Sequence, residues 1–299
     1  MKIILTGSLG HISKPVTEQL VKLGHAVTVI SHSAARAAQI TALGATPAIG
    51  SIDDEAFLTR TFQGTDAVYL MITAATTTGD IFEAGRQEAM IYANAVKAAG
   101  VKQVVNLSSV GANLGPEVGA LHIYNIIEGV LTAELPGVNL TFIRPTGMYY
   151  NLFGQLATIR QDHAIYTNSS LTKPNSWVAP VDIAPVVVQA LTAPAAGTTV
   201  QYVASDEKTY PEVAAILATA LGMPDLKVIQ ISDEQLLKRL TAVNPRTEFF
   251  TQYVKMTAYE RDHDFYVDYR AHQPVLGPTK LTDFATTFAK VYHQQASAE

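Results

Sequence analysis

An α/β fold, with a doubly wound parallel sheet and a smaller C-terminal α+β lobe, is the fold class that the sequence predicts, from three observations. Apolar runs of strand length alternate with helical segments of about ten or more residues over the first half of the chain, which is typical of parallel strands joined by right-handed crossovers. The run 67–72 is apolar throughout, as expected of a strand covered on both faces. Beyond Pro145, polar and aromatic stretches such as 167–176 and 253–269 replace this alternation and predict a separate lobe.

The first strand and helix carry the most informative motif. The apolar strand 2–5 leads into Gly7 and Gly10, and an amphipathic helix that ends at Gly24 follows. In the dinucleotide fingerprint, the first glycine makes a tight turn, the second lets the backbone approach a pyrophosphate, and the third lets the helix pack close to the strand. Ser13 stands at the third position. An ordinary turn would use glycine as well, but the context favours a Rossmann-type dinucleotide site at the helix N-terminus.

The other elements follow in order along the chain. The sequence predicts strands at 25–30, 46–49, 67–72, 102–107 and 138–143, and helices at 36–43, 53–64, 80–100, 120–135, 181–191 and 210–221. Two of the helices have N-terminal signals. Asp53 is the predicted cap of one, and Asp80 with Glu83 has the spacing of a capping box.

These elements predict two parts. Residues 1–151 form a dinucleotide-binding domain, completed by 177–205, and residues 152–176 and 206–299 form a smaller substrate-side lobe. A substrate cleft is expected between the carboxyl ends of the sheet and this lobe. Its candidate walls are the aromatic side chains of Phe153, Tyr166 and Trp177.

Composition excludes several classes of protein. The net charge of −5 lacks the basic excess of a protein that binds nucleic acid directly, and no apolar run reaches the roughly 20 residues of a membrane span. The chain has no cysteine, and its eight histidines are scattered, so that neither disulfides nor a metal site is predicted. A cytoplasmic location is the expectation.

The segment behind the glycine turn points to the cofactor. A carboxylate about 20 residues after the glycines holds the ribose of NAD and repels the additional phosphate of NADP. Between Gln19 and Ile52 there is no Asp or Glu, whereas Ser31, His32 and Arg36 follow the second predicted strand. Hydroxyl, imidazole and guanidinium groups suit a phosphate. The sequence therefore favours NADP(H) over NAD(H), although Arg36 could also be a solvated helix residue.

Several motifs in order carry a resemblance to a known family. They are Thr6-Gly7-x-x-Gly10-x-x-Ser13, Gly50-Ser51-Ile52-Asp53, Phe62-Gln63-Gly64-Thr65-Asp66, Leu107-Ser108-Ser109, Arg144-Pro145 and Trp177-Val178-Ala179-Pro180-Val181-Asp182. With them the chain resembles the atypical short-chain dehydrogenase/reductases, and most of all their NmrA-like branch. That branch mixes NADPH-dependent quinone reductases with NADP-sensing regulators, so that the resemblance is more specific for fold than for function.

The resemblance implies a set of cofactor-binding positions. Pyrophosphate contacts fall on Gly7, Leu9, Gly10, His11 and Ile12, contacts to the second phosphate near Ser31, His32 and Arg36, and adenine contacts on Ser51 and Ile52. Ile72, Thr73 and Ala74 would pass under the pyrophosphate and ribose, and Ser108, Asn125 and Pro145 would lie near the nicotinamide and its ribose.

The catalytic pair of many superfamily members is absent. Those enzymes carry Tyr and Lys four residues apart, on one face of a helix. Here Glu128 stands four residues after Tyr124, and Asn125 takes the place of the Lys in the Lys-x-x-Glu pattern of NmrA-like relatives. An amide can donate a hydrogen bond but cannot lower the pKa of a tyrosine through charge. Ketone reduction by a Tyr–Lys pair is therefore disfavoured.

Quinone reduction survives this loss, because hydride addition yields an aromatic phenolate that solvent or a nearby histidine can protonate. His122, Asn125 and Tyr149 are the candidate catalytic residues, with capping, solvent or core roles as the alternatives. The predicted function is an NADPH-dependent oxidoreductase of quinones or similar conjugated small molecules. A non-catalytic NADP(H)-sensing regulatory protein is the alternative, and a homodimer or a regulatory protein partner stays open.

Overall fold

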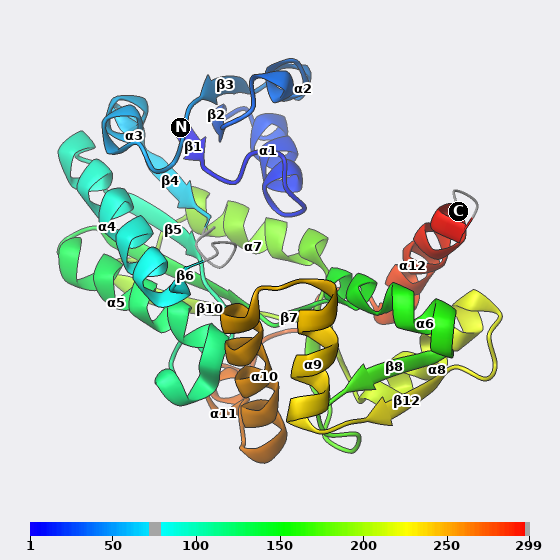
Figure 1. Ribbon diagram of the computed structural model, residues 1–299. Coiled ribbons are helices and arrows are strands. Elements are labelled where there is room, and N and C mark those ends of the chain that lie inside the picture. The colour runs from blue at the N-terminus through cyan, green and yellow to red at the C-terminus, as the bar shows by residue number, and fades with distance from the viewer. Residues whose placement is uncertain (72–78, 297–299) are drawn as a thin grey trace. The chain divides into compact units, whose positions relative to one another are not determined.

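The computed structural model describes residues 1–71 and 79–296, which divide into two compact units (Figure 1). The sheet unit comprises Met1–Gly115, Leu121–Pro145 and Ile183–Tyr202, and the C-terminal unit comprises Pro116–Ala120, Thr146–Asp182 and Val203–Glu299. The two units are therefore described in turn.

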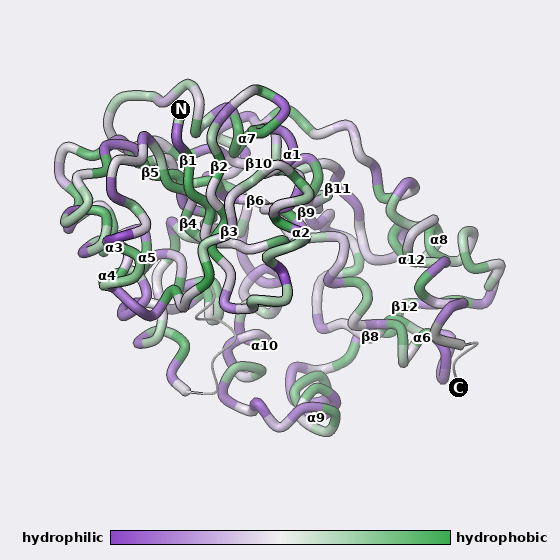
Figure 2. Tube along the Cα trace, turned by 90° about the horizontal axis from the view of Figure 1, so that it is seen from above, coloured by the Kyte–Doolittle hydropathy of each residue, from purple (hydrophilic) through white to green (hydrophobic). Residues whose placement is uncertain are grey.

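The predicted sheet forms the centre of the sheet unit, with a seventh strand, 198–203, in addition to the six that the sequence predicted. Its order is β10-β6-β5-β4-β1-β2-β3, and the five pairings from β6 to β3 are parallel. The strands are β1 (Lys2–Leu5), β2 (Ala26–Ser31), β3 (Thr46–Ile49), β4 (Ala67–Leu70), β5 (Gln103–Leu107), β6 (Asn139–Pro145) and β10 (Thr198–Val203). This is a Rossmann-type order, whose direction reverses between β1 and β4. Every residue of β4 and β5 is buried, and Figure 2 shows the hydrophobic colour along the central strands.

Helices cover both faces of this sheet. They are α1 (Ser13–Lys22), α2 (Ala37–Ala42), α3 (Glu55–Phe62), α4 (Ile81–Ala99), α5 (His122–Glu134) and α7 (Pro180–Thr192). Figure 1 shows α3, α4 and α5 side by side, and the three pack against one another in sequence. Right-handed crossovers that run the other way from β1 bring α1 and α2 to the opposite face.

The helix boundaries follow their local signals, with one correction. Asp54, not Asp53, caps α3, because its Oδ1 accepts the Phe57 N–H at 2.9 Å, whereas Asp53 is bound locally to Ser51. Asp80 caps α4 as predicted, by accepting the N–H groups of Phe82 and Glu83. Gly100, in the left-handed conformation, ends α4.

The C-terminal unit contains two small sheets and six helices among its described residues. Strands β11 (Asp206–Lys208), β9 (Asn175–Val178) and β7 (Gly147–Met148) form one sheet, and β12 (Lys227–Gln230) pairs with β8 (Ala164–Thr167) in the other. The helices are α6 (Leu156–Asp162), α8 (Tyr210–Leu221), α9 (Asp233–Val243), α10 (Thr247–Asp262), α11 (Val267–Ala271) and α12 (Leu281–Ala296). Only α8 among them was predicted. Helices α10 and α11 occupy most of the polar and aromatic stretch 253–269, for which the sequence predicted no element.

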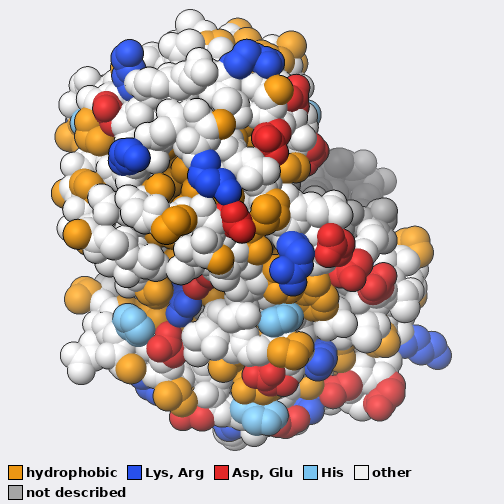
Figure 3. All heavy atoms as spheres, turned by 90° about the vertical axis from the view of Figure 1, so that its left-hand side faces the viewer, with side chains coloured by type: hydrophobic (Ala, Val, Ile, Leu, Met, Phe, Trp, Pro, Cys, Tyr) orange, Lys and Arg blue, Asp and Glu red, His pale blue; other side chains and the backbone are white. Residues whose placement is uncertain are grey.

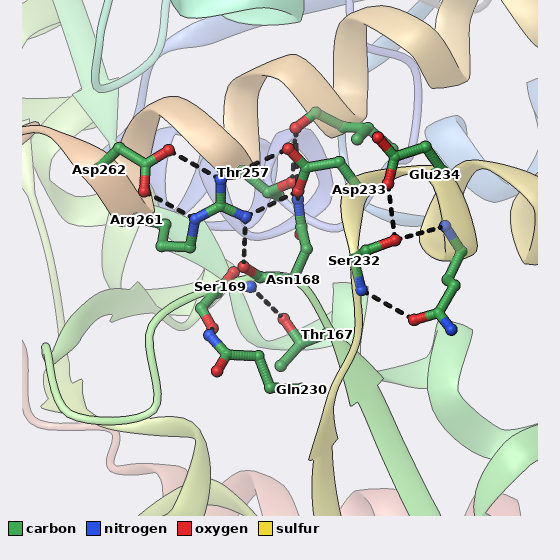
Figure 4. A network of polar contacts seen from close by, with 12 residues as sticks. Thr167, Asn168, Ser169, Gln230, Ser232, Asp233, Glu234, Thr257, Arg261 and Asp262 are labelled. Carbon is green, nitrogen blue, oxygen red and sulfur yellow. Dashed lines mark hydrogen bonds and ion pairs between the residues drawn. The ribbon is translucent and has the colours of Figure 1, made fainter.

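A polar network ties α9 and α10 to the end of β8 (Figure 4). The Arg261 guanidinium donates to Asp233 Oδ1 at 2.7 Å, to Asp262 Oδ2 at 2.7 Å and to the Asn168 carbonyl at 3.1 Å. Hydrogen bonds to Arg261 lower the pKa values of both aspartates. The positive charge of Arg261 is thus paired with two aspartates of the C-terminal unit.

Candidate functional site

Gly7 and Ser13 fit together beneath the glycine turn. A Cβ atom built on Gly7 would lie 1.9 Å from Ser13 Oγ, and Ser13 itself is fully buried. The Ser13 hydroxyl has no hydrogen-bond partner among the described residues. The space left by the missing side chain of Gly7 therefore accommodates the hydroxymethyl group that replaces the third glycine.

The turn leaves the start of α1 without a side-chain cap. Ile12 occupies the N-cap position and forms no capping hydrogen bond, and the first turn of α1 has no acidic residue. Leu9 and Gly10 are half-buried and His11 is exposed on the same turn. Uncapped N–H groups at the positive end of a helix dipole are suited to a phosphate group.

Ser8 links this turn to the end of β2. Its φ of +50° lies in the left-handed region, which is uncommon for residues other than glycine. In that conformation Ser8 Oγ donates to Ser31 Oγ at 3.0 Å and accepts from Arg36 Nη1 at 3.1 Å. The strained serine thus joins a buried hydroxyl and an exposed guanidinium.

Arg36 has no ion pair among the residues that the structure describes, because no carboxylate oxygen there lies within 4.0 Å of its guanidinium. Its hydrogen-bond partner is a neutral hydroxyl. His32, next to it in sequence, is exposed. Ser31, Arg36 and His32 therefore gather polar and positive groups next to the glycine turn.

The structure describes the positions expected at the adenine, but not those expected under the pyrophosphate and ribose. Ser51 follows β3, is exposed, and exchanges hydrogen bonds with Asp53, to whose carboxylate it donates at 3.2 Å. Ile52 is half-buried beside it. Ile72, Thr73 and Ala74 lie outside the described residues.

At the carboxyl ends of β5 and β6, a second polar cluster is buried. Glu128 of α5 accepts from Ser108 Oγ at 2.5 Å, from Arg144 Nε at 2.9 Å and from Arg144 Nη2 at 2.6 Å. Arg144 Nη1 donates to the Tyr202 hydroxyl at 3.0 Å. Burial alone would lower the pKa of Arg144, but hydrogen bonding to Glu128 outweighs it and raises the pKa.

Glu128 stands where Tyr–Lys enzymes carry their lysine, and in this structure it is paired with Arg144. The bidentate contact with Arg144 neutralises its charge. Sequence reasoning missed this network and the role of Ser8. The available signal was Arg144, a charged residue next to the last residue of a mostly apolar strand.

The three candidate catalytic residues lie in different surroundings. His122 begins α5 with its ring 5.6 Å from that of Phe82, and its Nδ1 has no hydrogen-bond partner among the described residues. Asn125 Nδ2 donates to the Ala112 carbonyl at 2.9 Å and so holds the loop after β5.

Tyr149 belongs to the hydrophobic core of the C-terminal unit. It is fully buried, stacks on Phe284 with ring centroids 5.4 Å apart, and donates to the Thr279 carbonyl at 3.2 Å. Burial, and then the charge of nearby aspartates, raise the pKa of its hydroxyl. In that setting Tyr149 has the contacts of a core residue. Pro145, by contrast, ends β6 in the sheet unit, where its carbonyl accepts the Val110 N–H at 2.9 Å.

The described residues form neither a metal-binding group nor a membrane-spanning helix. No group of three His, Cys, Asp or Glu residues there could hold a metal ion. No helix among the described residues is long and apolar enough to cross a membrane. On the face shown in Figure 3, basic and acidic side chains are interspersed.

Comparison with known proteins gives a family match and several relatives. The model of the NmrA-like family matches residues 1–285. The chain is 27% identical over 251 residues to an NAD(P)H azoreductase of Xenophilus azovorans, covering 81% of each chain. It is also 26% identical over 216 residues to the photosystem II assembly factor Ycf39 of Synechocystis, covering 72% of this chain but only 63% of the factor.

Solved structures share the fold at low identity. The NADPH complex of the quinone oxidoreductase QOR2 of Escherichia coli superimposes with a TM-score of 0.76 at 20% identity, over 96% of this chain and 99% of that one. The triphenylmethane reductase of Citrobacter, complexed with NADP(H), gives a TM-score of 0.75 at 17% identity, over 97% and 100% of the two chains.

Proposed function

The chain belongs to the NmrA-like family, and on that basis we propose that it is an NADPH-dependent oxidoreductase of quinones or similar conjugated small molecules. One relative named as an NAD(P)H azoreductase and structural neighbours named as quinone and triphenylmethane reductases support this proposal. Such compounds share a conjugated, electron-poor system. The bound dinucleotide would supply a hydride to it.

The single observation that carries the cofactor assignment is the state of Arg36. A guanidinium whose partner is the neutral Ser8 hydroxyl keeps its charge for an anion, and Ser31 supplies a buried hydroxyl beside it. The segment lacks the carboxylate that would hold an NAD ribose and repel a phosphate. These groups fit the additional phosphate of NADP(H).

The glycine turn fits the rest of the dinucleotide. A side chain at position 7 would meet Ser13, so that the turn presents bare backbone there. The uncapped start of α1 offers N–H groups to a pyrophosphate. In this proposal Gly7, Leu9, Gly10, His11 and Ile12 hold the pyrophosphate, and Ser51 and Ile52 lie at the adenine.

At the reactive end, the chain's own residues bind and orient rather than deliver protons. Glu128 is paired with Arg144, and Asn125 donates a hydrogen bond to the Ala112 carbonyl. Helix α5 contains no lysine. Substrates whose reduced forms are stable anions or neutral molecules suit such a site. Simple ketones, whose reduction needs a proton at the carbonyl oxygen, do not.

The experiment that tests the proposal follows NADPH oxidation with a panel of acceptors: a benzoquinone, an azo dye, a triphenylmethane dye and a simple ketone. We expect turnover above the protein-free rate with at least one of the first three and none with the ketone. Absence of turnover with every acceptor would overturn the enzyme proposal.

A non-catalytic NADP(H)-sensing protein is the second candidate, since one relative is named as an assembly factor. Its signature would be tight binding of NADPH and NADP+ without turnover of any acceptor. Calorimetric titration with both forms of the cofactor, alongside the acceptor panel, separates the two candidates.

A further inference from the structure

Ser108 lies where the sheet order places one end of a bound dinucleotide. Ligands of open parallel sheets bind outside the carboxyl ends of the strands, at the point where the strand order reverses. That point lies between β1 and β4, and β5 is the next strand beyond β4. Ser108 directly follows β5, and its N–H donates to the Ile143 carbonyl of β6 at 2.7 Å. Since the glycine turn after β1 suits the pyrophosphate, the nicotinamide half of a bound dinucleotide would extend toward the β4–β5 side.

The hydrogen bonds of Ser108 fix the direction of its hydroxyl proton. Ser108 Oγ lies 2.5 Å from Glu128 Oε1, its only hydrogen-bond partner among the described residues. Both carboxylate oxygens of Glu128 accept an N–H donor from Arg144, and a carboxylate can only accept. The one proton of the serine hydroxyl must therefore point to Glu128. The lone pairs of Ser108 Oγ remain for a donor on the other side.

We propose that Ser108 accepts a hydrogen bond from the carboxamide N–H of the nicotinamide, with Glu128 as the positioning residue that makes it an acceptor. The inference rests on the proposed NADP(H) function and adds a residue role to it. A carboxamide NH₂ group is a donor, and Ser108 offers it a lone pair in a nearly buried place, 3% exposed.

The same hydrogen-bond arrangement gives Ser108 no part in protonating a substrate, because its proton is committed to Glu128. The four elements that the cluster joins, β5, β6, β10 and α5, hold the oxygen in place. A fixed acceptor loses little entropy when it binds its donor.

The test compares NADPH with its reduced 3-acetylpyridine analogue, which has a methyl ketone in place of the carboxamide and so lacks the N–H donors. We expect wild-type protein to bind NADPH more tightly than the analogue. Ser108→Ala should lower that preference by roughly three- to tenfold, the range for one hydrogen bond. Ser109→Ala is the matched control, because the hydroxyl of this neighbouring residue forms no hydrogen bond among the described residues. This variant should keep the wild-type preference.

Glu128→Gln tests the positioning role separately. The amide nitrogen of the new glutamine can donate to Ser108 Oγ and would then compete with the carboxamide for its lone pairs. The preference for NADPH over the analogue should therefore fall. Binding of adenosine 2′,5′-bisphosphate, which lacks the nicotinamide half, should stay at the wild-type level in all three variants and reports an intact site.

The outcomes separate this inference from the function on which it rests. If Ser108→Ala keeps the full wild-type preference while binding NADPH, the acceptor role is wrong and the proposed function stands. If wild-type protein binds neither NADPH nor adenosine 2′,5′-bisphosphate, both are wrong.

Discussion

The two ends of the sheet unit's candidate site each hold an arginine, and they use it in opposite ways. Arg36, beside the glycine turn, is exposed and contacts the neutral Ser8 hydroxyl. Arg144, at the end of β6, is buried and makes a bidentate pair with Glu128. A charge without a protein counterion is available to a ligand, whereas a charge that is paired inside the fold holds the framework. The first end is thus suited to recognition and the second to precise placement.

The largest effect should come from breaking the buried pair. Glu128→Ala removes the carboxylate that pairs with the buried Arg144 guanidinium, and we expect the free energy of unfolding to fall by about 3–5 kcal/mol. Urea denaturation measures it. Arg36→Ala is the control and should change stability by no more than about 0.5 kcal/mol, as is usual for exposed side chains. Equal costs for the two variants would remove the contrast between the two arginines.

The affinity for NADPH, unlike the stability of the fold, should depend strongly on Arg36. Arg36→Ala removes a charge-assisted contact to the additional phosphate, and we expect NADPH to bind roughly 10- to 100-fold more weakly. NADH, which lacks that phosphate, should bind as to the wild type. A variant that weakens both cofactors alike would mean that Arg36 acts on the fold of the turn and not on the phosphate.

The fit between Gly7 and Ser13 predicts a pair of compensating substitutions. Gly7→Ala places a methyl group against Ser13 Oγ, and overpacking of this kind costs about 1–3 kcal/mol. Adding Ser13→Gly should restore most of the lost stability and NADPH binding, because it removes the clashing atoms. Thermal unfolding of the two single variants and the double variant measures the coupling. Simple additivity would show that the two positions do not interact.

A half-buried glutamate without an arginine partner, Glu260, provides the smallest effect and sharpens the role of pairing. Glu260 has no cation within ion-pair distance among the described residues, and its partners are Tyr266 and Asn175. Burial raises its pKa. The folded protein therefore holds this proton over a pH range in which the unfolded chain has lost it, so that stability falls as pH rises through that range.

Glu260→Gln should flatten this part of the pH dependence of stability, while the low-pH loss that comes from Asp233 and Asp262 stays. Denaturation midpoints between about pH 2 and pH 9 measure both. An unchanged slope on the alkaline side would mean that Glu260 does not titrate differently in the two states.

Six of the seven strands of the sheet unit could be predicted from the sequence because they are short runs of mostly apolar residues. The run 67–70 is apolar throughout and fully buried, and 103–107 is buried with Val104, Val105 and Leu107 as its apolar residues. The C-terminal unit was harder to predict. Its strands are as short as two residues, as in β7, and α10 carries polar and aromatic residues around its axis. The Ser232–Gln235 capping box was a local signal that could have identified α9.

For the site, the local motif at Gly7 and Gly10 could be found in the sequence, but the contacts around it could not. The Arg36 to Ser8 hydrogen bond joins residues 28 positions apart. It also depends on a positive φ at a serine, which no sequence rule selects. The pairing of Glu128 with Arg144 likewise depends on how α5 lies against the sheet. Folding creates these partners, and they decide which charges remain available.

The most direct test of the account is a calorimetric titration of the wild-type protein with NADPH and with NADH under the same salt concentration. Arg36 lies next to the glycine turn and has no counterion among the described residues, which predicts that NADPH binds at least about tenfold more tightly. Equal affinity for the two cofactors, or tighter binding of NADH, would contradict it.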